Sequence, residues 1–168
     1  SGVGANLDLT AGGGDILFSQ AAGSGTNQQL GVITVVSADD VTLVNRLNAG
    51  SFVQQGGSGD LTFQDNLTLS AALDVSSNRV LLDGLTMTSG GELRFRSPTR
   101  VEDSAVLLDS GSGGIRFDDT VTGDKNLTLA ADLGDITLTG AVSVKDFSVT
   151  DGQSLVANQS ITVNSLSM

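Results

Sequence analysis

Charged side chains of both signs gather around one stretch of the chain, FDDTVTGDK, at residues 117–125. The stretch holds Asp118, Asp119 and Asp124, and Arg116 directly precedes it. Arg94 has the same place in the word GELRF that Arg116 has in the later word GGIRF. Clustered carboxylates can act as general acid and base on a glycosidic bond, and arginine can bind an anion or assist beside Ca²⁺. These five residues are therefore the candidates for a ligand contact or a catalytic site.

The residue types that are missing exclude most other chemistry. The chain contains no His and no Cys, which rules out a Ser-His-Asp triad, a cysteine nucleophile and an ordinary zinc site. Three interpretations remain: a surface ladder of charges, a contact with an anionic glycan, and a polysaccharide-cleaving site. Two stacked arginines repel each other unless anions lie beside them, and Glu92, Glu102 and Asp118 can supply those anions. The charge ladder is the favoured interpretation, and no catalytic residue is assigned.

Turn aspartates raise the question of calcium. Calcium prefers carboxylate and carbonyl oxygens, which acidic turns can provide. The candidate groups are Asp39 with Asp40, Asp118 with Asp119, and Asp132 with Asp135. The GGxGxD nonapeptide of calcium-binding β-rolls is absent from the sequence. We therefore expect no cofactor and no catalytic metal, and calcium remains open only as a structural ion.

Composition limits the class of partner. The 168 residues carry a net charge of −11, and the acids are scattered, usually beside Gly, Asn or Ser. Such a surface repels nucleic acid and anionic membranes, so neither is expected as a partner. No apolar run approaches the roughly 18 residues of a membrane-spanning segment, so no membrane insertion is expected. The simplest explanation of the acids is that they are solvated turn residues.

Apolar and polar residues alternate in short runs along the whole chain. Clear examples are LTF at 61–63, LTL at 67–69, LRF at 93–95, LTL at 127–129 and ITLT at 136–139. This period-two alternation is typical of half-buried strands. Between the runs lie words such as GGG, SADD, QQGGSGD and TGDK, whose residue types form turns. The sequence predicts an all-β protein without helices.

The same words return at a fixed interval. NLDLTAGGGDILFSQ begins at Asn6, NLTLSAALD at Asn66 and NLTLAADLGDITLTG at Asn126. A second motif, Gly-x-(Ile/Leu)-x-(Phe/Leu), has its last three copies at similar intervals, in GELRF, GGIRF and GDITL. Rungs of about 20 residues, grouped in threes, explain the 60-residue echo. They predict one domain over residues 1–168, a single-stranded parallel β-helix. The competing β-sandwich gives no reason for the echo.

Stacking of rungs predicts that residues at the same position on successive rungs face the same side, either the core or the solvent. We expect the aliphatic residues of the strand words to point inward and the threonines between them to point outward. The inward set is Leu67, Leu69, Leu127, Leu129, Ile136 and Leu138, and the outward set is Thr68, Thr128, Thr137 and Thr139.

The repeats also predict positions within the rung for phenylalanines, asparagines and glycines. Phe18, Phe95 and Phe117 should share one inward slot, and the last two should stack. Asn6, Asn66 and Asn126 should share a turn slot, where an Asn side chain can bond backbone. The glycines that open the Gly-Asp words should supply positive φ at corners. The 32-residue step from Phe63 to Phe95 fits no whole number of rungs and requires an insertion or a switch of face.

The carboxyl-terminal part of the chain resembles a known kind of repeat. NLTLAADLGDITLTGAV at 126–142 and FSVTDGQSLVANQSITVNSL at 147–166 are similar to the two alternating repeats of bacterial surface exoproteins of the filamentous-haemagglutinin type. Weaker copies cover most of the chain. The resemblance implies a right-handed β-helix, secretion to the bacterial cell surface, and a role in adhesion or cell contact. It implies no particular ligand.

These observations together predict a non-enzymatic shaft segment of a secreted or cell-surface bacterial adhesin, as part of a longer chain. The expected partners are a host-cell or matrix surface, including its glycans. The open ends of a solenoid also predict end-to-end self-association. The alternative is a polysaccharide-binding or polysaccharide-cleaving β-helix, which a cleft lined by acids on consecutive rungs would favour. A passive scaffold in a filament is a third hypothesis.

Overall fold

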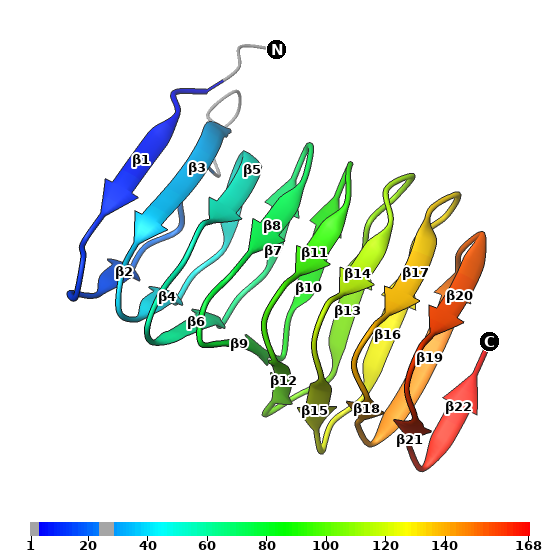
Figure 1. The fold of residues 1–168 in the computed structure, drawn as a ribbon. Coiled ribbons are helices and arrows are strands. Elements are labelled where there is room, and N and C mark those ends of the chain that lie inside the picture. The colour runs from blue at the N-terminus through cyan, green and yellow to red at the C-terminus, as the bar shows by residue number, and fades with distance from the viewer. Residues whose placement is uncertain (1–3, 24–28) are drawn as a thin grey trace.

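The computed structural model describes residues 4–23 and 29–168, and this part of the chain contains strands and no helix. The chain winds as a solenoid in which most turns consist of three short strands, and every strand pair is parallel (Figure 1). The two termini lie at opposite ends of the stack. The predicted all-β parallel solenoid is confirmed. No helix of the described part is long and apolar enough to cross a membrane.

We call the three sides of the solenoid the first, second and third face, in the order in which a turn visits them. The third face is a separate sheet of eight strands stacked in chain order. Its members are β2 (Ile16–Phe18), β4 (Val41–Leu43), β6 (Asp60–Phe63), β9 (Arg79–Asp83), β12 (Thr99–Glu102), β15 (Val121–Gly123), β18 (Val142–Ser143) and β21 (Ile161–Thr162). At a spacing of about 4.8 Å between strands, this stack is about 35 Å long.

The first and second faces join into one sheet of 14 strands at the amino-terminal end. The joining strands are β3 (Leu30–Ser37) and β5 (Leu47–Gln54), each eight residues long. The first half of β5 pairs with a first-face strand and its second half with a second-face strand. The remaining first-face strands are β7 (Leu67–Leu69), β10 (Thr86–Ser89), β13 (Val106–Asp109), β16 (Leu127–Ala130), β19 (Asp146–Asp151) and β22 (Ser165–Ser167). The second-face strands are β1 (Leu7–Thr10), β8 (Leu73–Val75), β11 (Leu93–Phe95), β14 (Ile115–Phe117), β17 (Asp135–Leu138) and β20 (Ser154–Ala157).

Rung length agrees with the prediction and varies at the corners. Leu67 lies beside Met87 on the next rung, and Leu93 lies beside Ile115. The step along the chain from Leu67 to Met87 is slightly shorter than the step from Leu93 to Ile115. Most strand pairs keep their register, because a slip by one residue would turn every inward side chain to solvent. The register shifts only at the ends of the β1–β3 and β16–β19 pairs among the strands that the structure describes. The corners therefore absorb the differences in length.

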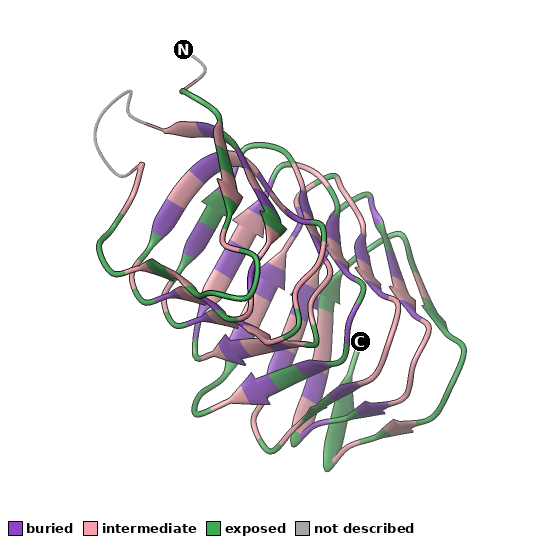
Figure 2. Ribbon diagram, turned by 60° about the vertical axis from the view of Figure 1, so that its left-hand side comes forward, coloured by how far each residue is buried: buried purple, intermediate pink, exposed green. Residues whose placement is uncertain are grey.

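The core is a set of apolar columns inside the solenoid. Buried residues alternate with less buried ones along the inner strands, and the strands at the two ends are less buried (Figure 2). All six predicted inward residues of the strand words are buried, at 3% exposure or less. The four threonines between them are half-buried or exposed. The predicted alternation is confirmed. Full burial of one such side chain contributes about 1.5–3 kcal/mol.

The phenylalanines confirm one expectation and correct another. The rings of Phe95 and Phe117 stack in parallel, with centroids 4.8 Å apart. Phe18 does not share their slot, because β2 and β6 belong to the third face and not to the second. Phe63 lies in β6, so the irregular step from Phe63 to Phe95 is a switch of face and not an insertion. The Gly-Asp word occurs on both faces because its alternation suits any buried strand.

The three repeated asparagines do not share one slot. Asn6 precedes β1, which stacks on the second-face half of β3, whereas Asn66 and Asn126 precede the first-face strands β7 and β16. Asn66 and Asn126 also differ in position. The column of stacked residues that contains Leu67 continues through Met87 and Leu108 to Leu129, and not to Leu127, the residue that follows Asn126. The asparagine motif therefore recurs in the sequence, but its copies do not occupy equivalent positions in the stack of rungs.

Two of these asparagines nevertheless have the same local role. The Oδ1 of Asn6 accepts a hydrogen bond from the Val32 N–H at 2.9 Å, and the Oδ1 of Asn66 accepts one from the Thr86 N–H at 2.8 Å. Each amide therefore satisfies a backbone donor of the following rung, and not of its own turn as expected.

The glycines of the Gly-Asp words do not have the backbone conformation that was predicted. Gly14, Gly59 and Gly134 are not among the residues of positive φ, so the prediction of positive φ at these positions is wrong. A Cβ on Gly134 would lie 1.6 Å from the carbonyl oxygen of Gly113, and one on Gly59 would lie 2.1 Å from the Oδ1 of Asp40. Glycine is needed at these two corners because neighbouring rungs approach each other closely there. A Cβ on Gly14 would meet only the Ala11 carbonyl oxygen of its own turn, at 3.4 Å.

Candidate functional site

Arg94 and Arg116 lie side by side on the outer surface of the second face, as predicted. They are register partners in β11 and β14. Asp118 follows the end of β14 and contacts both, with the Arg94 Nε donating to its Oδ2 at 2.9 Å and the Arg116 Nε donating to its Oδ1. The Arg94 Nη2 also lies 2.8 Å from the Oδ2. One carboxylate is therefore shared by two stacked guanidinium groups and ties adjacent rungs together.

A second ion pair extends this surface by one rung. Asp74 in β8 is the register partner of Arg94, but it binds Arg96 through two hydrogen bonds of 2.5 and 2.7 Å. The five residues Asp74, Arg94, Arg96, Arg116 and Asp118 form a continuous charged surface that we call the second-face ladder. Two of its pairs are diagonal, Arg94 with Asp118 and Arg96 with Asp74, because each joins adjacent rungs and is displaced by two residues along the strand. The third pair, Arg116 with Asp118, lies within one rung.

Two of the three anions expected beside the arginines do not form ion pairs with them. Glu102 belongs to β12 on the third face and pairs with Arg100 at 2.7 Å. Glu92 makes no ion pair with any residue that the structure describes. Of the three, Asp118 alone contacts the arginine pair, because it is one rung along on the same face.

The environment of Asp118 favours its charged form. Partial burial opposes ionisation, but hydrogen bonds from Arg116 and Arg94 outweigh burial, and the pKa of Asp118 is lowered from its ordinary value. A general acid needs the opposite change, because it must hold a proton near neutral pH. The arrangement suits a structural or anion-contacting surface, and Asp118 is poorly placed to protonate a leaving group.

The other two candidate acids are not part of this ladder. Asp119 lies at the corner between β14 and β15, where its Oδ1 accepts the Thr120 N–H at 2.6 Å. Asp124 lies at the next corner, pairs with Lys125 at 3.1 Å, and has 81% of its side chain exposed. The hydrogen bond from Lys125 lowers the pKa of Asp124. The acidic word FDDTVTGDK is thus divided among three environments.

The aspartates considered for calcium are not assembled into a cation site. Within residues 4–23 and 29–168, no group of three or more acidic side chains is placed to hold a metal ion. Asp39 instead accepts a hydrogen bond from the Ser58 hydroxyl at 2.8 Å. Asp135 accepts one from the Ser154 hydroxyl at 2.5 Å. Both acids bind the following rung.

A ladder of aspartates on the third face was not anticipated. Asp15, Asp40 and Asp60 each directly precede an inward residue of a third-face strand, at successive rungs. The Oδ1 of Asp15 accepts the Asp40 N–H at 3.2 Å, and the Oδ1 of Asp40 accepts the Asp60 N–H at 2.7 Å. Arg79 ends the series with a 2.6 Å contact to Asp60. The signal in the sequence was an aspartate immediately before the first inward residue of each of these three strands.

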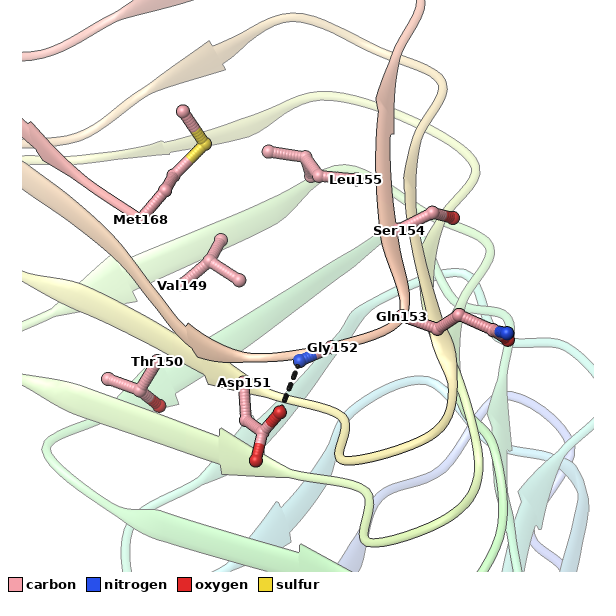
Figure 3. Close-up of a pocket in the computed structure, with 8 residues that line it drawn as sticks. All are labelled: Val149, Thr150, Asp151, Gly152, Gln153, Ser154, Leu155 and Met168. Atoms are coloured by element: carbon pink, nitrogen blue, oxygen red, sulfur yellow. Dashed lines mark hydrogen bonds between the residues drawn. The ribbon is translucent and has the colours of Figure 1, made fainter.

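The carboxyl-terminal rung leaves the core open. A hollow of about 360 Å³ lies there, and its lining includes Val149, Leu155 and Met168 (Figure 3). The turn below it is closed by Asp151, whose Oδ1 accepts the Gly152 N–H at 2.8 Å. The side chains that face the hollow are apolar because they continue the inward columns. The hollow is therefore an uncovered end of the core.

The comparisons with known proteins add no relative. The chain matches no family model, no curated protein and no solved structure.

Proposed function

We propose that this chain is a structural shaft segment of a secreted or cell-surface bacterial adhesin and that it serves adhesion or cell contact. The observation that carries the proposal is the unbroken stacking of rungs on three faces. A rung added to such a stack lengthens the rod and leaves its cross-section unchanged, which is what a spacer requires. The resemblance of residues 126–166 to repeats of surface exoproteins points to the same setting.

The proposal includes no enzymatic activity. The second-face ladder pairs its charges across rungs, and the lowered pKa of Asp118 opposes a role as general acid. In this proposal the ladder stabilises the shaft, and contacts with a host-cell or matrix surface are weak and repeated along the sides of the rod.

The test is a binding assay in which release of sugar is scored in the same wells. Beads coated with the chain are incubated with host cells and with a panel of polysaccharides, with and without Ca²⁺. Retention on cells or glycans without release of sugar is the expected result. Release of sugar that Asp118→Asn abolishes would contradict the proposal, and so would a complete lack of retention on every surface.

A further inference from the structure

A second hollow lies on the outer side of the first face, away from the second-face ladder. It has a volume of about 280 Å³ and is lined by Arg46, Leu47, Asn48, Asn66 and Thr68. Arg46 directly precedes β5, and Asn48 and Thr68 are register partners in β5 and β7. The hollow therefore bridges two adjacent rungs. We call it the Arg46 niche.

Arg46 differs from the other arginines of the described chain. Arg79, Arg94, Arg96, Arg100 and Arg116 each contact a carboxylate. The guanidinium of Arg46 makes no ion pair and no hydrogen bond with any residue that the structure describes. The lining of the niche contains no acidic side chain. In a chain of net charge −11, this is a local site of positive charge with all its donors available.

The other polar groups of the niche are fixed beside Arg46. The Oδ1 of Asn66 accepts the Thr86 N–H at 2.8 Å, which sets the orientation of the amide and leaves its Nδ2 as a donor. Asn48 adds a second amide, and the exposed Thr68 adds a hydroxyl. Both residues stand on strands whose register is set by the core, so the groups are held on a rigid support.

The chemistry of these groups identifies a class of ligand. The planar fork of an arginine matches a carboxylate through two parallel hydrogen bonds. Amides and a hydroxyl can pair with the hydroxyls of a sugar. The volume lies just below the roughly 300–1,000 Å³ of ordinary ligand pockets, which fits one small polar unit. The net negative charge of the chain disfavours a continuous polyanion.

We propose that the Arg46 niche binds a carboxylate-bearing sugar unit, a uronate, within a polysaccharide that is otherwise largely neutral. The carboxylate pairs with Arg46, and ring hydroxyls pair with Asn48, Asn66 and Thr68. This binding site goes beyond the proposed shaft role and does not depend on it, because a shaft needs no localised sugar site.

The test follows backbone amide signals by NMR while galacturonate is added to the chain. The expected result is saturable binding, with shifts centred on residues 46–48 and 66–68. Galactose and the methyl ester of galacturonate, which lack the carboxylate, should bind at least about tenfold more weakly, since tenfold corresponds to about 1.4 kcal/mol. Arg46→Gln should lose binding to a similar extent, and Arg46→Lys should retain part of it, because lysine keeps the charge without the fork.

The matched control is Arg100→Gln, which removes an arginine from the third face and should leave galacturonate binding unchanged. Circular dichroism establishes that each variant is folded. The proposal is overturned by equal binding of galactose, by undiminished binding in folded Arg46→Gln, by shifts located elsewhere, or by no binding at all. None of these outcomes affects the shaft proposal, whose bead assay scores adhesion to any surface.

Discussion

Many side chains of this solenoid act across rungs as well as within one. The Arg94, Arg116 and Asp118 group shows why. Adjacent rungs are about 4.8 Å apart, so an outward side chain always has a neighbour of the next rung within reach. A column of like charges is unfavourable there, and the carboxylate of Asp118, which contacts both arginines, reduces the repulsion. The same principle explains the hydrogen bonds that Asn6 and Asn66 make to the following rung.

The substitution Asp118→Asn tests the importance of the second-face ladder. We expect it to lower the free energy of unfolding by about 1–3 kcal/mol at neutral pH, because two guanidinium groups lose their shared anion. The pKa of Asp118 is lowered in the folded state. Its contribution is therefore present above the ordinary aspartate pKa of about 3.9 and is lost as the pH falls through the folded value. Urea unfolding of both proteins between neutral and acidic pH measures the effect.

Asp124→Asn is the control for this experiment. Its side chain is 81% exposed and pairs with its neighbour Lys125. We expect no measurable change in stability from it. Two results would contradict the role given to Asp118. One is an equal loss of unfolding free energy from the two substitutions. The other is a difference in unfolding free energy between wild type and Asp118→Asn that does not shrink below about pH 4.

Gln54 is a polar residue in an apolar column. It lies between Val35 and Val75, is 2% exposed, and its amide nitrogen and oxygen have no hydrogen-bond partner in the described structure. A buried amide without partners costs about 1–3 kcal/mol. We expect Gln54→Met, which keeps nearly the same volume, to raise the midpoint of urea unfolding. A loss of stability would show that the amide of Gln54 is satisfied in solution.

Strands and corners contribute differently at the scale of the element. The strands are short and interchangeable, and their alternation alone places them around a core. The corners set the distance between rungs, and at Gly113 and Gly134 the two backbones approach so closely that a side chain has no space. The structure therefore tolerates variation in strand residues better than in these glycines.

Gly134→Ala tests the close approach at one corner. Its Cβ would meet the Gly113 carbonyl oxygen, so we expect a loss of more than about 2 kcal/mol as the two rungs are forced apart. Gly13→Ala is the matched control, because a Cβ there meets nothing within 4 Å and φ is not positive. The two melting temperatures measure the difference. A Gly134→Ala protein as stable as Gly13→Ala would contradict the close packing of rungs.

At the scale of the molecule, the solenoid has two uncovered ends. Leu166 in the last strand, the register partner of buried Phe147, is 48% exposed. At the other end, the inward residues Ile16 and Phe18 are only partly buried. The outer edges of β20, β21 and β22 also carry backbone groups that no further strand pairs in the described structure. Unpaired edges and apolar ends favour association with a similar edge.

We therefore predict that this segment self-associates end to end. Sedimentation should show a mass that rises with protein concentration and with salt, because salt screens the repulsion between chains of charge −11. Leu166→Lys should weaken association by placing a charge on the terminal strand. Thr88→Lys, on the outward side of β10 near the middle of the rod, should leave association unchanged. A monodisperse monomer over a wide range of concentration would contradict the prediction.

The kind of fold and much of its interior follow from the order of residues alone. Alternation predicts which residues face inward, because burial of aliphatic side chains outweighs other local preferences, and residues such as Leu67 and Ile136 are placed as expected. Repetition predicts that rungs stack, because stacking places the similar residues of successive rungs in contact, where they pack favourably. The neighbouring positions of Arg94 and Arg116 follow from this rule, since both occupy the same place in nearly identical words.

The face that each word occupies, and what lies beside it, depend on the folded chain as a whole. Gly-Asp-Ile-x-Phe suits a strand on any face, so Phe18 could not be assigned to the third face from its own word. The number of residues in a corner varies from rung to rung. A fixed period therefore does not predict which residues of distant rungs are equivalent. For this reason the sequence did not separate Asp118 from Asp119 and Asp124, nor did it bring Arg46 together with Asn66 and Thr68. Those neighbours belong to different rungs, and their positions follow from the winding of the whole chain.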